Sequence, residues 1–380
     1  MPLAFTGDQK GILPDHMIAA LAKSGAIIPS NAFDPDQIQP ASLDLRLGEV
    51  AYRVRASFLP GPRTTVAERI DELKLHEIAL TDGAVLETGC VYIVPLLESL
   101  ALPADIAAAA NPKSSTGRLD VFTRVIADET RGFDRIKAGY HGPLYAEISP
   151  KTFPILVREG SRLSQIRFRH GNGLLDADAL RALHTHERLV DDDDSDVGEG
   201  VAVGVDLSGF PHPSPPPHAG DGREGVIVGY RAKRHTAVID VERRAGYDVG
   251  EFWEPMKARP DRSLILDPDE FYILASKEAV QVPPDYAAEM VPFDPLVGEF
   301  RVHYAGFFDP GFGYAGAGGR GARAVLEVRS REVPFILEHG QIVGRLVYEK
   351  MLERPKSVYG QSIGSNYQAQ SLKLSKHFRT

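Results

Sequence analysis

The chain has 380 residues, of which 43% are hydrophobic, enough to form the cores of two or three domains. Its 43 Lys and Arg residues against 52 Asp and Glu residues give a net charge of −9, which excludes a global basic field that would attract a nucleic acid polymer. The single cysteine, Cys90, excludes an intrachain disulfide framework and a zinc site built from several thiolates. A polyphosphate ligand would therefore need local cations, a bound divalent metal, or both.

The first fifty residues predict one helix and one strand. The N-terminal residues lack the basic region and apolar core of a signal peptide, and nowhere do about 18 apolar residues run uninterrupted. We therefore expect a cytoplasmic protein without a membrane span. Apolar residues at helical spacing predict a short helix over Leu13–Lys23. Gln39–Gly48 alternates polar and apolar residues, which predicts a strand. Asp44 and Arg46 would lie opposite its leucines, and we expect them to form a solvated or interface ion pair.

From Ile78 onward, short apolar segments are separated by Gly, Pro and Asp, which is typical of a β-sandwich or barrel. A second short helix is predicted over Asp178–Arg188. The acidic run Asp191–Asp194 indicates a solvated connector, and the proline-rich stretch Gly209–Gly222 indicates an exposed linker. In the first half, five segments are predicted as strands: Ala84–Leu86, Val91–Leu97, Arg124–Ala127, Leu144–Ile148 and Leu163–Phe168.

The second half of the chain repeats the first at a constant offset, the one that separates Glu147 from Glu327. A constant offset across separated motifs indicates a tandem duplication of one β domain. We therefore predict a mainly β fold with a few short helices, with copy one over residues 1–190 and copy two over residues 198–380. The repeated pairs are Leu102–Asp105 with Val282–Asp285, Ala146–Glu147 with Leu326–Glu327, Phe153–Ile155 with Val333–Phe335, and Glu159–Gly160 with His339–Gly340.

One compact run in copy one has groups suited to a phosphorylated ligand. Positive charge and hydroxyl donors converge there, where an anion could bind. About thirty residues later, Glu147 lies inside an apolar strand, where partial removal from water raises the pKa of a carboxyl toward the range that a general base needs. The alternative interpretation is a surface turn followed by a strand with a solvated Glu. The residues of this run are Lys113, Ser114, Ser115, Thr116 and Arg118.

The two copies differ where this chemistry would lie. At the offset of the cationic run, copy two has Phe293–Gly298, which carries neither hydroxyl groups nor cations. Copy two instead carries the turn Phe308–Gly313 with Asp309, where copy one has Lys137. A glutamate in the equivalent strand is present in both copies.

In order along the chain, these motifs resemble the dCTP deaminases of the dUTPase-like superfamily. Gln39–Gly48 is similar to the family's first motif, and Lys113–Arg118 is similar to its phosphate loop. Phe308–Phe312 is similar to its Asp-Pro-Gly turn, and the strands of Glu147 and Glu327 are similar to the strand that carries its catalytic Glu. The resemblance implies that each copy has the dUTPase-like fold, a β-clip or barrel.

The family's activity is hydrolytic deamination of dCTP to dUTP and ammonia, with Glu147 or Glu327 as general base and acid. The resemblance implies Mg²⁺ bound with the triphosphate and no zinc, since one cysteine cannot supply the Pro-Cys-x-x-Cys motif of zinc deaminases. Ordinary members are single-domain trimers with sites between subunits, so we expect a homo-oligomer, with a trimer favoured. The C-terminal segment Tyr359–Gln370 is similar to the tail that folds over the nucleotide. The implied substrate-binding residues are Lys113, Ser114, Ser115, Arg118, Asp309, Tyr359, Tyr367 and Gln370.

The division of motifs between the copies leaves alternatives open. If like domains meet, Glu147 would be the base; if unlike domains meet, Arg118 of copy one would share a composite site with Asp309 and Glu327 of copy two. A dUTP diphosphatase, or a bifunctional enzyme, would use Asp309 as the base for attack on phosphorus. A protein that binds nucleotides without catalysis is the remaining alternative.

Overall fold

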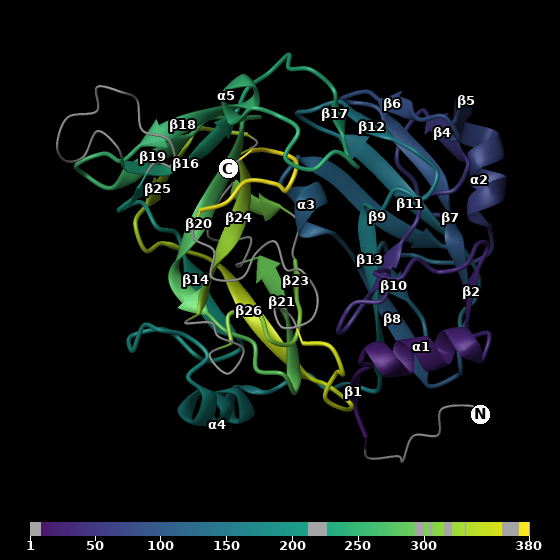
Figure 1. The fold of residues 1–380 in the computed structure, drawn as a ribbon, viewed down its shortest axis with the longest axis horizontal. Coiled ribbons are helices and arrows are strands. Elements are labelled where there is room, and N and C mark those ends of the chain that lie inside the picture. Colours follow the sequence, from purple (N-terminus) through teal and green to yellow (C-terminus); the bar gives the residue numbers. More distant parts are fainter. Residues whose placement is uncertain are drawn as a thin grey trace.

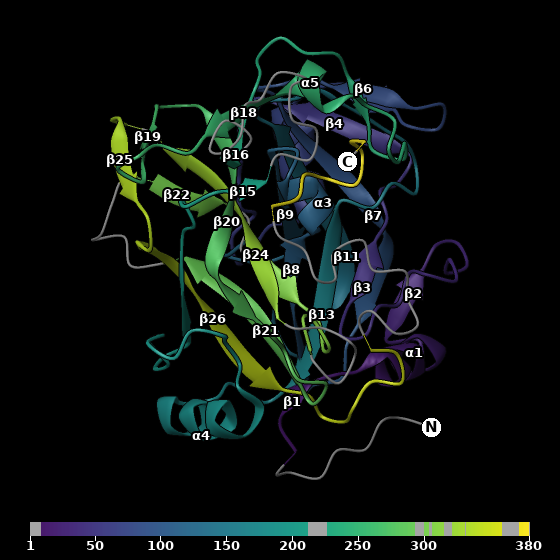
Figure 2. The ribbon, with the colours of Figure 1, turned by 60° about the vertical axis from the view of Figure 1, so that its left-hand side comes forward.

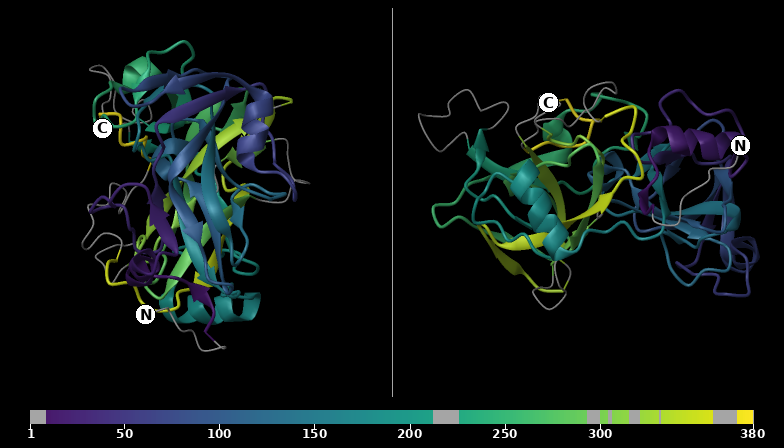
Figure 3. Two further views of the ribbon diagram at one scale, coloured as in Figure 1. Left: turned by 90° about the vertical axis from the view of Figure 1, so that its right-hand side faces the viewer. Right: turned by 90° about the horizontal axis from the view of Figure 1, so that it is seen from below.

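The computed structural model describes residues 9–211, 226–292, 300–303, 306–314, 321–330, 332–358 and 372–379 (Figure 1). Their secondary structure is mainly β, and the two halves of the chain lie side by side (Figures 1 and 3). The described residues also contain five short helices: α1 (Asp15–Lys23), α2 (Val66–Leu73), α3 (Ser114–Gly117), α4 (Ala177–Glu187) and α5 (Val249–Phe252).

The first half is built on two large sheets and a small one. The first has the order β1 (Gly11–Ile12), β13 (Ser164–His170), β8 (Ile106–Pro112) and β10 (Arg135–Ile136), with β3 (Leu43–Leu45) also paired to β13. The second has the order β5 (Lys74–Ala79), β4 (Val50–Val54), β7 (Val91–Ala101), β11 (His141–Pro150) and β9 (Val121–Ala127), with β2 (Ile27–Pro29) paired to β7. The small sheet contains β6 (Ala84–Leu86) and β12 (Ile155–Val157).

The second half repeats this plan. One sheet has the order β14 (Val201–Gly204), β26 (Ile342–Lys350), β21 (Tyr286–Pro292) and β23 (Phe307–Phe308). The next has the order β15 (Phe210–Pro211), β16 (Val226–Ala232), β20 (Phe271–Val280), β24 (Ala322–Ser330) and β22 (Phe300–His303), with β18 (Trp253–Lys257) paired to β16. The small sheet pairs β19 (Ser263–Leu266) with β25 (Phe335–Glu338).

Equivalent strands begin at the offset found in the sequence. β7, β8 and β12 start at Val91, Ile106 and Ile155, and β20, β21 and β25 start at the positions that the same offset predicts, Phe271, Tyr286 and Phe335. The predicted tandem duplication is therefore confirmed. The five segments predicted as strands from Ala84 onward are also present, most of them longer by a few residues, whereas the strand predicted over Gln39–Gly48 is only the three-residue β3, Leu43–Leu45.

Two helix predictions are confirmed, and the ends of those helices follow local chemistry. α1 begins at Asp15, because Pro14 occupies its N-cap with φ −76° and ψ 169°. α4 begins after Asp176, whose side chain accepts a hydrogen bond from the backbone N–H of Ala179 at 2.9 Å. α2 was not predicted, although its N-terminus is a capping box formed by Thr65 and Glu68.

The expectation for Asp44 and Arg46 is wrong, and the expectation of a linker falls mostly outside the described residues. Asp44 and Arg46 are buried, and each pairs with a different partner, because the whole segment from Ser42 to Leu47 is buried rather than at the surface. The expected linker Gly209–Gly222 begins with the strand β15, and residues 212–222 lie outside the described residues.

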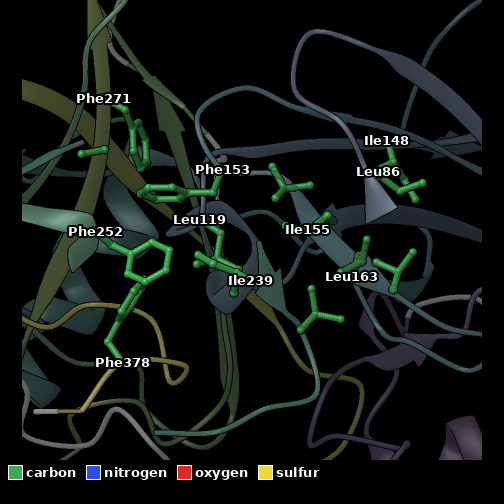
Figure 4. Close-up of a cluster of buried hydrophobic side chains, with 14 of the residues drawn as sticks. Leu86, Leu119, Ile148, Phe153, Ile155, Leu163, Ile239, Phe252, Phe271 and Phe378 are labelled. Atoms are coloured by element: carbon green, nitrogen blue, oxygen red, sulfur yellow. The ribbon is translucent and has the colours of Figure 1, made fainter. Parts of the chain in front are cut away.

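A shared hydrophobic core joins the two halves. β17 (Ile239–Asp240) of the second half pairs in parallel with β12 of the first half. Phe153 packs edge-on against Phe252, with ring centroids 5.8 Å apart (Figure 4). It also packs edge-on against Trp253, with ring centroids 5.3 Å apart. Phe378, close to the C-terminus, packs against Phe252 at 5.5 Å. The junction therefore holds the halves in a fixed relation and places α3 beside β24 (Figure 1).

Candidate active site

The cationic run of copy one forms α3, a single helical turn at the junction of the two halves. The carbonyl oxygen of Lys113 accepts hydrogen bonds from the backbone N–H groups of Thr116 at 2.8 Å and Gly117 at 3.0 Å. The Thr116 hydroxyl donates to the carbonyl of Leu163 at 2.9 Å, and Ser115 and Thr116 are buried. The turn is thus fixed by its surroundings, and the alternative interpretation as an ordinary surface turn is wrong.

Arg118 reaches from this turn into the second half. Its guanidinium is buried, its Nη1 donates to the carbonyl oxygen of Lys373 at 3.1 Å, and its Nε lies 3.9 Å from Oε1 of Glu327. A buried guanidinium beside a buried carboxylate forms an ion pair with little screening by water. Residues of unlike halves therefore meet within one chain.

Glu327 lies on β24, directly across from Ile273 of β20 and His303 of β22. Its side chain is buried, and burial raises its pKa to about 8, although the positive charge of Arg118 opposes this shift. A carboxyl with a pKa near 8 exchanges a proton at physiological pH, which is the property that a general acid and base requires.

Glu147, at the equivalent place on β11, has different neighbours. Arg124 lies directly across from it on β9 and donates to Glu147 Oε1 from Nη2 at 2.5 Å and from Nε at 3.1 Å. The Arg124 guanidinium also stacks 3.4 Å from the ring centroid of Phe133 and 4.6 Å from that of Phe122. Since two aromatic rings contact this arginine and it donates twice to the same carboxylate oxygen, Glu147 is held in a fixed ion pair.

Asp309 follows β23 and faces a buried arginine from the first half. Arg167 of β13 donates to Asp309 Oδ1 at 2.9 Å, to the carbonyl of Phe308 at 2.9 Å and to that of Ala288 at 2.8 Å. Burial raises the pKa of the Asp309 carboxyl above its ordinary value, and Arg167 opposes the shift. Arg167 was missed in the sequence, where the available signal was a cation within the apolar strand Leu163–Phe168.

The first motif lies against the phosphate-loop candidate. Lys113 forms an ion pair with the buried carboxylate of Asp44, and Arg162 Nη1 lies 3.6 Å from the same carboxylate. Ser114 is only half-buried, beside these charges. Asp44 therefore orients the first cation of the run, a role that sequence reasoning did not assign to it.

The described end of the chain packs on the same turn. The Ser375 hydroxyl donates to the carbonyl of Ser115 at 2.9 Å and contacts Nδ1 of His377 at 2.8 Å. His377 Nε2 lies 2.9 Å from the carbonyl of Val241. Figure 2 shows this end of the chain beside α3. The tail residues named above, Tyr359, Tyr367 and Gln370, lie outside the described residues.

The carboxylates around the phosphate-loop candidate do not form a metal site of their own. Among the described residues, no group of three or more His, Cys, Asp and Glu side chains is placed to hold a metal ion. Asp44, which pairs with Lys113 of the loop, and Asp309, which pairs with Arg167, are both already paired with cations. A Mg²⁺ ion at this site would therefore be held by the phosphate oxygens of a ligand rather than by a carboxylate cage.

Within the described parts, no helix is long and apolar enough to cross a membrane.

Comparison with known proteins gives matches over both halves. Residues 9–172 match the family model described as the 2′-deoxycytidine 5′-triphosphate deaminase (DCD) N-terminal domain, and residues 176–378 match the C-terminal domain of the same family. The crystal structure of 2′-deoxycytidine 5′-triphosphate deaminase from Agrobacterium tumefaciens is similar with a TM-score of 0.84. It is 64% identical in sequence, and the match covers 90% of this chain and 99% of that chain.

Curated relatives match about two-fifths of the chain. A dCTP deaminase from Haloarcula marismortui is 30% identical over 161 residues, which are 41% of this chain and 79% of the relative. A protein from Corynebacterium kroppenstedtii named "dCTP deaminase, dUMP-forming" is 33% identical over 156 residues, 41% of this chain and 79% of the relative. These relatives are thus similar to a segment about the size of one copy.

Proposed function

The chain belongs to the 2′-deoxycytidine 5′-triphosphate deaminase family and acts as a dCTP deaminase, and on that premise we propose that its active site is composite. In this proposal, the phosphate loop of copy one and Glu327 of copy two form one site within a single chain. The observation that carries it is the pair of Arg118 and Glu327, whose side chains lie 3.9 Å apart across the junction.

The triphosphate binds at α3. Arg118 and the hydroxyls of Ser114 and Ser115 donate hydrogen bonds to phosphate oxygens, and Lys113 adds positive charge. Mg²⁺, when bound with the triphosphate, neutralises part of its charge. Because Arg118 comes from the loop and ends beside Glu327, the same guanidinium orients the nucleotide toward the glutamate.

Glu327 carries the proton. Its ionised form takes a proton from a water molecule, whose oxygen adds to carbon 4 of cytosine. Its protonated form then gives a proton to the amino nitrogen, the bond between carbon 4 and nitrogen breaks, and ammonia leaves as dUTP forms. A pKa near 8 suits both steps, since neither form is scarce at neutral pH. The buried position also keeps bulk water away from the reacting carbon.

Glu147 has a structural role in this proposal. Its carboxylate is already neutralised by Arg124, whose guanidinium lies over the rings of Phe122 and Phe133. Copy one therefore supplies the loop and not the base, and the chain binds one nucleotide rather than two.

Release of ammonia from dCTP, with CTP and dCMP as comparison substrates, tests the proposal. We expect release from dCTP that depends on Glu327. Tight binding of dCTP without ammonia release would instead establish a protein that binds nucleotides without catalysis. The stoichiometry of bound nucleotide, one per chain, tests the composite site separately from the activity.

A second product has specific support, because several relatives are named "dCTP deaminase, dUMP-forming". A bifunctional enzyme of that kind, or a dUTP diphosphatase, would also cleave the triphosphate. Asp309, the candidate base for attack on phosphorus, is held by Arg167 at 2.9 Å, which favours a positioning role over proton abstraction. Analysis of the products from dCTP and from dUTP distinguishes dUTP from dUMP.

The composite site also bears on assembly. The resemblance implies sites between subunits in single-domain members, whereas here two unlike copies already meet inside one chain. A trimer, the arrangement expected from the resemblance, is then not needed to bring Arg118 to Glu327.

A further inference from the structure

A second ion pair crosses the junction beside that of Arg118 and Glu327. It joins Asp120, which follows the phosphate-loop candidate, to Arg329, which lies two residues beyond Glu327 on β24. Asp120 is 1% exposed, and the side chain of Arg329 is 11% exposed. Because water screens such a pair poorly, its two charges hold each other firmly. Two ion pairs therefore join the loop of copy one to the glutamate strand of copy two.

Asp120 is fixed to the first half by its backbone and its side chain. Its φ of 55° is a left-handed conformation, which aspartate adopts more readily than most residues. Its N–H donates to the carbonyl of Gly117 at 2.9 Å, and its carbonyl accepts from the N–H of Lys151 at 2.9 Å. The hydroxyl of Thr152 donates to Asp120 Oδ2 at 2.5 Å. The carboxylate is thus rigidly connected to the turn that carries Arg118.

Arg329 is fixed in the same way to the second half. Its Nη1 donates to the carbonyl of Asp269, while its Nη2 donates to the Asp120 carboxylate and, at 3.0 Å, to the Thr152 hydroxyl. Residues two positions apart on a strand share a face, so Arg329 and Glu327 both face the loop. A movement of Asp120 relative to Arg329 would therefore also move the loop relative to Glu327.

The order of the charges allows one register between the loop and β24. Along the loop a cation, Arg118, precedes an anion, Asp120, whereas along the strand the anion Glu327 precedes the cation Arg329. A slip of two residues would set Arg118 against Arg329, or Asp120 against Glu327. Like charges repel strongly where water is excluded, so both slips are disfavoured.

This second pair accompanies Glu327 and has no equivalent beside Glu147. At the offset that relates the two copies, Arg329 corresponds to Ser149 and Asp120 corresponds to Phe300. Neither of these residues carries a charge. The pair therefore belongs to the one arrangement of loop and glutamate strand that the composite site uses.

We propose that Asp120 is a positioning residue for the deamination, which acts through Arg329 to set the distance between Arg118 and Glu327. This inference rests on the composite site proposed above. Asp120 holds the end of the loop against β24, and the Arg118 guanidinium then meets the Glu327 carboxylate at 3.9 Å. Asp120 itself touches neither the nucleotide nor the reacting water in this proposal.

The pH dependence of kcat/KM reads out this distance. Glu327 has the uncharged Ile273 across from it on β20, His303 across from it on β22, and Arg118 reaching it from α3. Because the charge of Arg118 lowers the pKa of Glu327, a longer distance raises that pKa. The profile of kcat/KM reports the free enzyme, so its acid limb should then move to higher pH. A loss of stability alone would lower the melting temperature and leave the limb in place.

Two substitutions loosen the second pair in different ways. Thr152→Val removes the bridging hydroxyl without changing any charge, and Asp120→Asn removes the carboxylate but keeps a residue that tolerates the left-handed backbone. Both should move the acid limb to higher pH, Asp120→Asn by about one pH unit. Asp120→Asn should also raise the KM for dCTP by about tenfold, because Arg118 is displaced from the triphosphate. Arg329→Lys, which keeps a cation beside Asp120, should retain most of the parental profile.

A matched control comes from another ion pair across the same junction. Arg158 donates to Asp240 at 2.8 and 3.0 Å, and Arg158→Gln should leave the acid limb unchanged. If Arg158→Gln moves the limb as far as Asp120→Asn does, the effect is a general loosening of the junction and the proposal is overturned.

The remaining outcomes also decide the proposal. An unmoved limb in Thr152→Val and Asp120→Asn would show that the second pair is only structural. A shift to lower pH in Asp120→Asn would show that the pair acts through its charges and not through position. If Asp120→Asn does not fold, the limb of Thr152→Val decides alone. The composite site fails separately, if Glu327→Gln keeps near-parental turnover.

Discussion

Arg118 of copy one lies with its Nε 3.9 Å from Oε1 of Glu327 of copy two, and its Nη1 donates to the carbonyl of Lys373. One guanidinium thus links the phosphate-loop candidate, the candidate base and the described end of the chain. The same contact brings together the phosphate-loop candidate of copy one and the glutamate strand of copy two.

Loss of this guanidinium should weaken nucleotide binding. A charge-assisted hydrogen bond contributes about 1.5–3 kcal/mol, so Arg118→Ala should reduce the affinity for dCTP by about 10- to 150-fold. Titration calorimetry measures the change, and circular dichroism checks the fold. Affinity equal to that of the parent would show that α3 is not the phosphate loop.

The raised pKa of Glu327 predicts a dependence of stability on pH. Its pKa is about 8 in the fold against an ordinary value of 4.5, so ionisation disfavours the folded state increasingly as the pH rises from 4.5 to about 8. Glu327→Gln removes this penalty, although it leaves Arg118 without its carboxylate. Relative to the parent, the variant should gain about 1–3 kcal/mol in the free energy of unfolding between pH 5 and pH 8.

Urea denaturation of both proteins at the two pH values measures this gain. A difference between variant and parent that is the same at pH 5 and pH 8 would contradict the raised pKa. Glu147→Gln is the matched control, since its carboxylate is paired with Arg124 in the other copy.

Chelation should affect binding and leave folding intact. If Mg²⁺ is held by the triphosphate, removal of divalent ions raises the KM for dCTP, because the full charge of the triphosphate then meets only the loop cations. The melting temperature of the nucleotide-free protein should not change. Elemental analysis should find no stoichiometric zinc, and one tightly held zinc per chain would overturn the proposed chemistry.

The described C-terminal end should contribute strongly to stability. Phe378 is 2% exposed and packs against Phe252 and Trp253 at the junction. Phe378→Ala should therefore lower the free energy of unfolding by about 3–5 kcal/mol. Arg379→Ala, at an exposed neighbour, should stay within about 0.5 kcal/mol. Equal effects of the two substitutions, measured by urea denaturation, would show that this end is not part of the core.

Much of the fold could be predicted from the sequence, because periodicity and turn residues are local signals. The strands of copy one are short apolar segments separated by Gly, Pro and Asp, and the constant offset between the repeated motifs extends the same assignment to copy two. α2 was missed although Thr65 and Glu68 form a readable capping box. Asp44 was misjudged, since its burial depends on Lys113 and Arg162, which are far away in the sequence.

The site could be predicted only in part, for a physical reason. Both copies carry Ala-Glu or Leu-Glu in equivalent strands, so the local sequence does not distinguish Glu147 from Glu327. What distinguishes them is the cross-strand neighbour, Arg124 for Glu147, and the reach of Arg118 across the junction. Both are contacts between distant segments, which a single sequence does not reveal.

The paired glutamate substitutions test the central claim, that Glu327 and not Glu147 is the general base. Glutamine keeps the shape of the side chain and removes its proton chemistry. Glu327→Gln should lower the turnover of dCTP by about 10²-fold or more while dCTP still binds, and Glu147→Gln should change turnover by only a few-fold. The measurement is ammonia release at saturating dCTP. A large loss in Glu147→Gln together with near-parental turnover in Glu327→Gln would contradict the composite site.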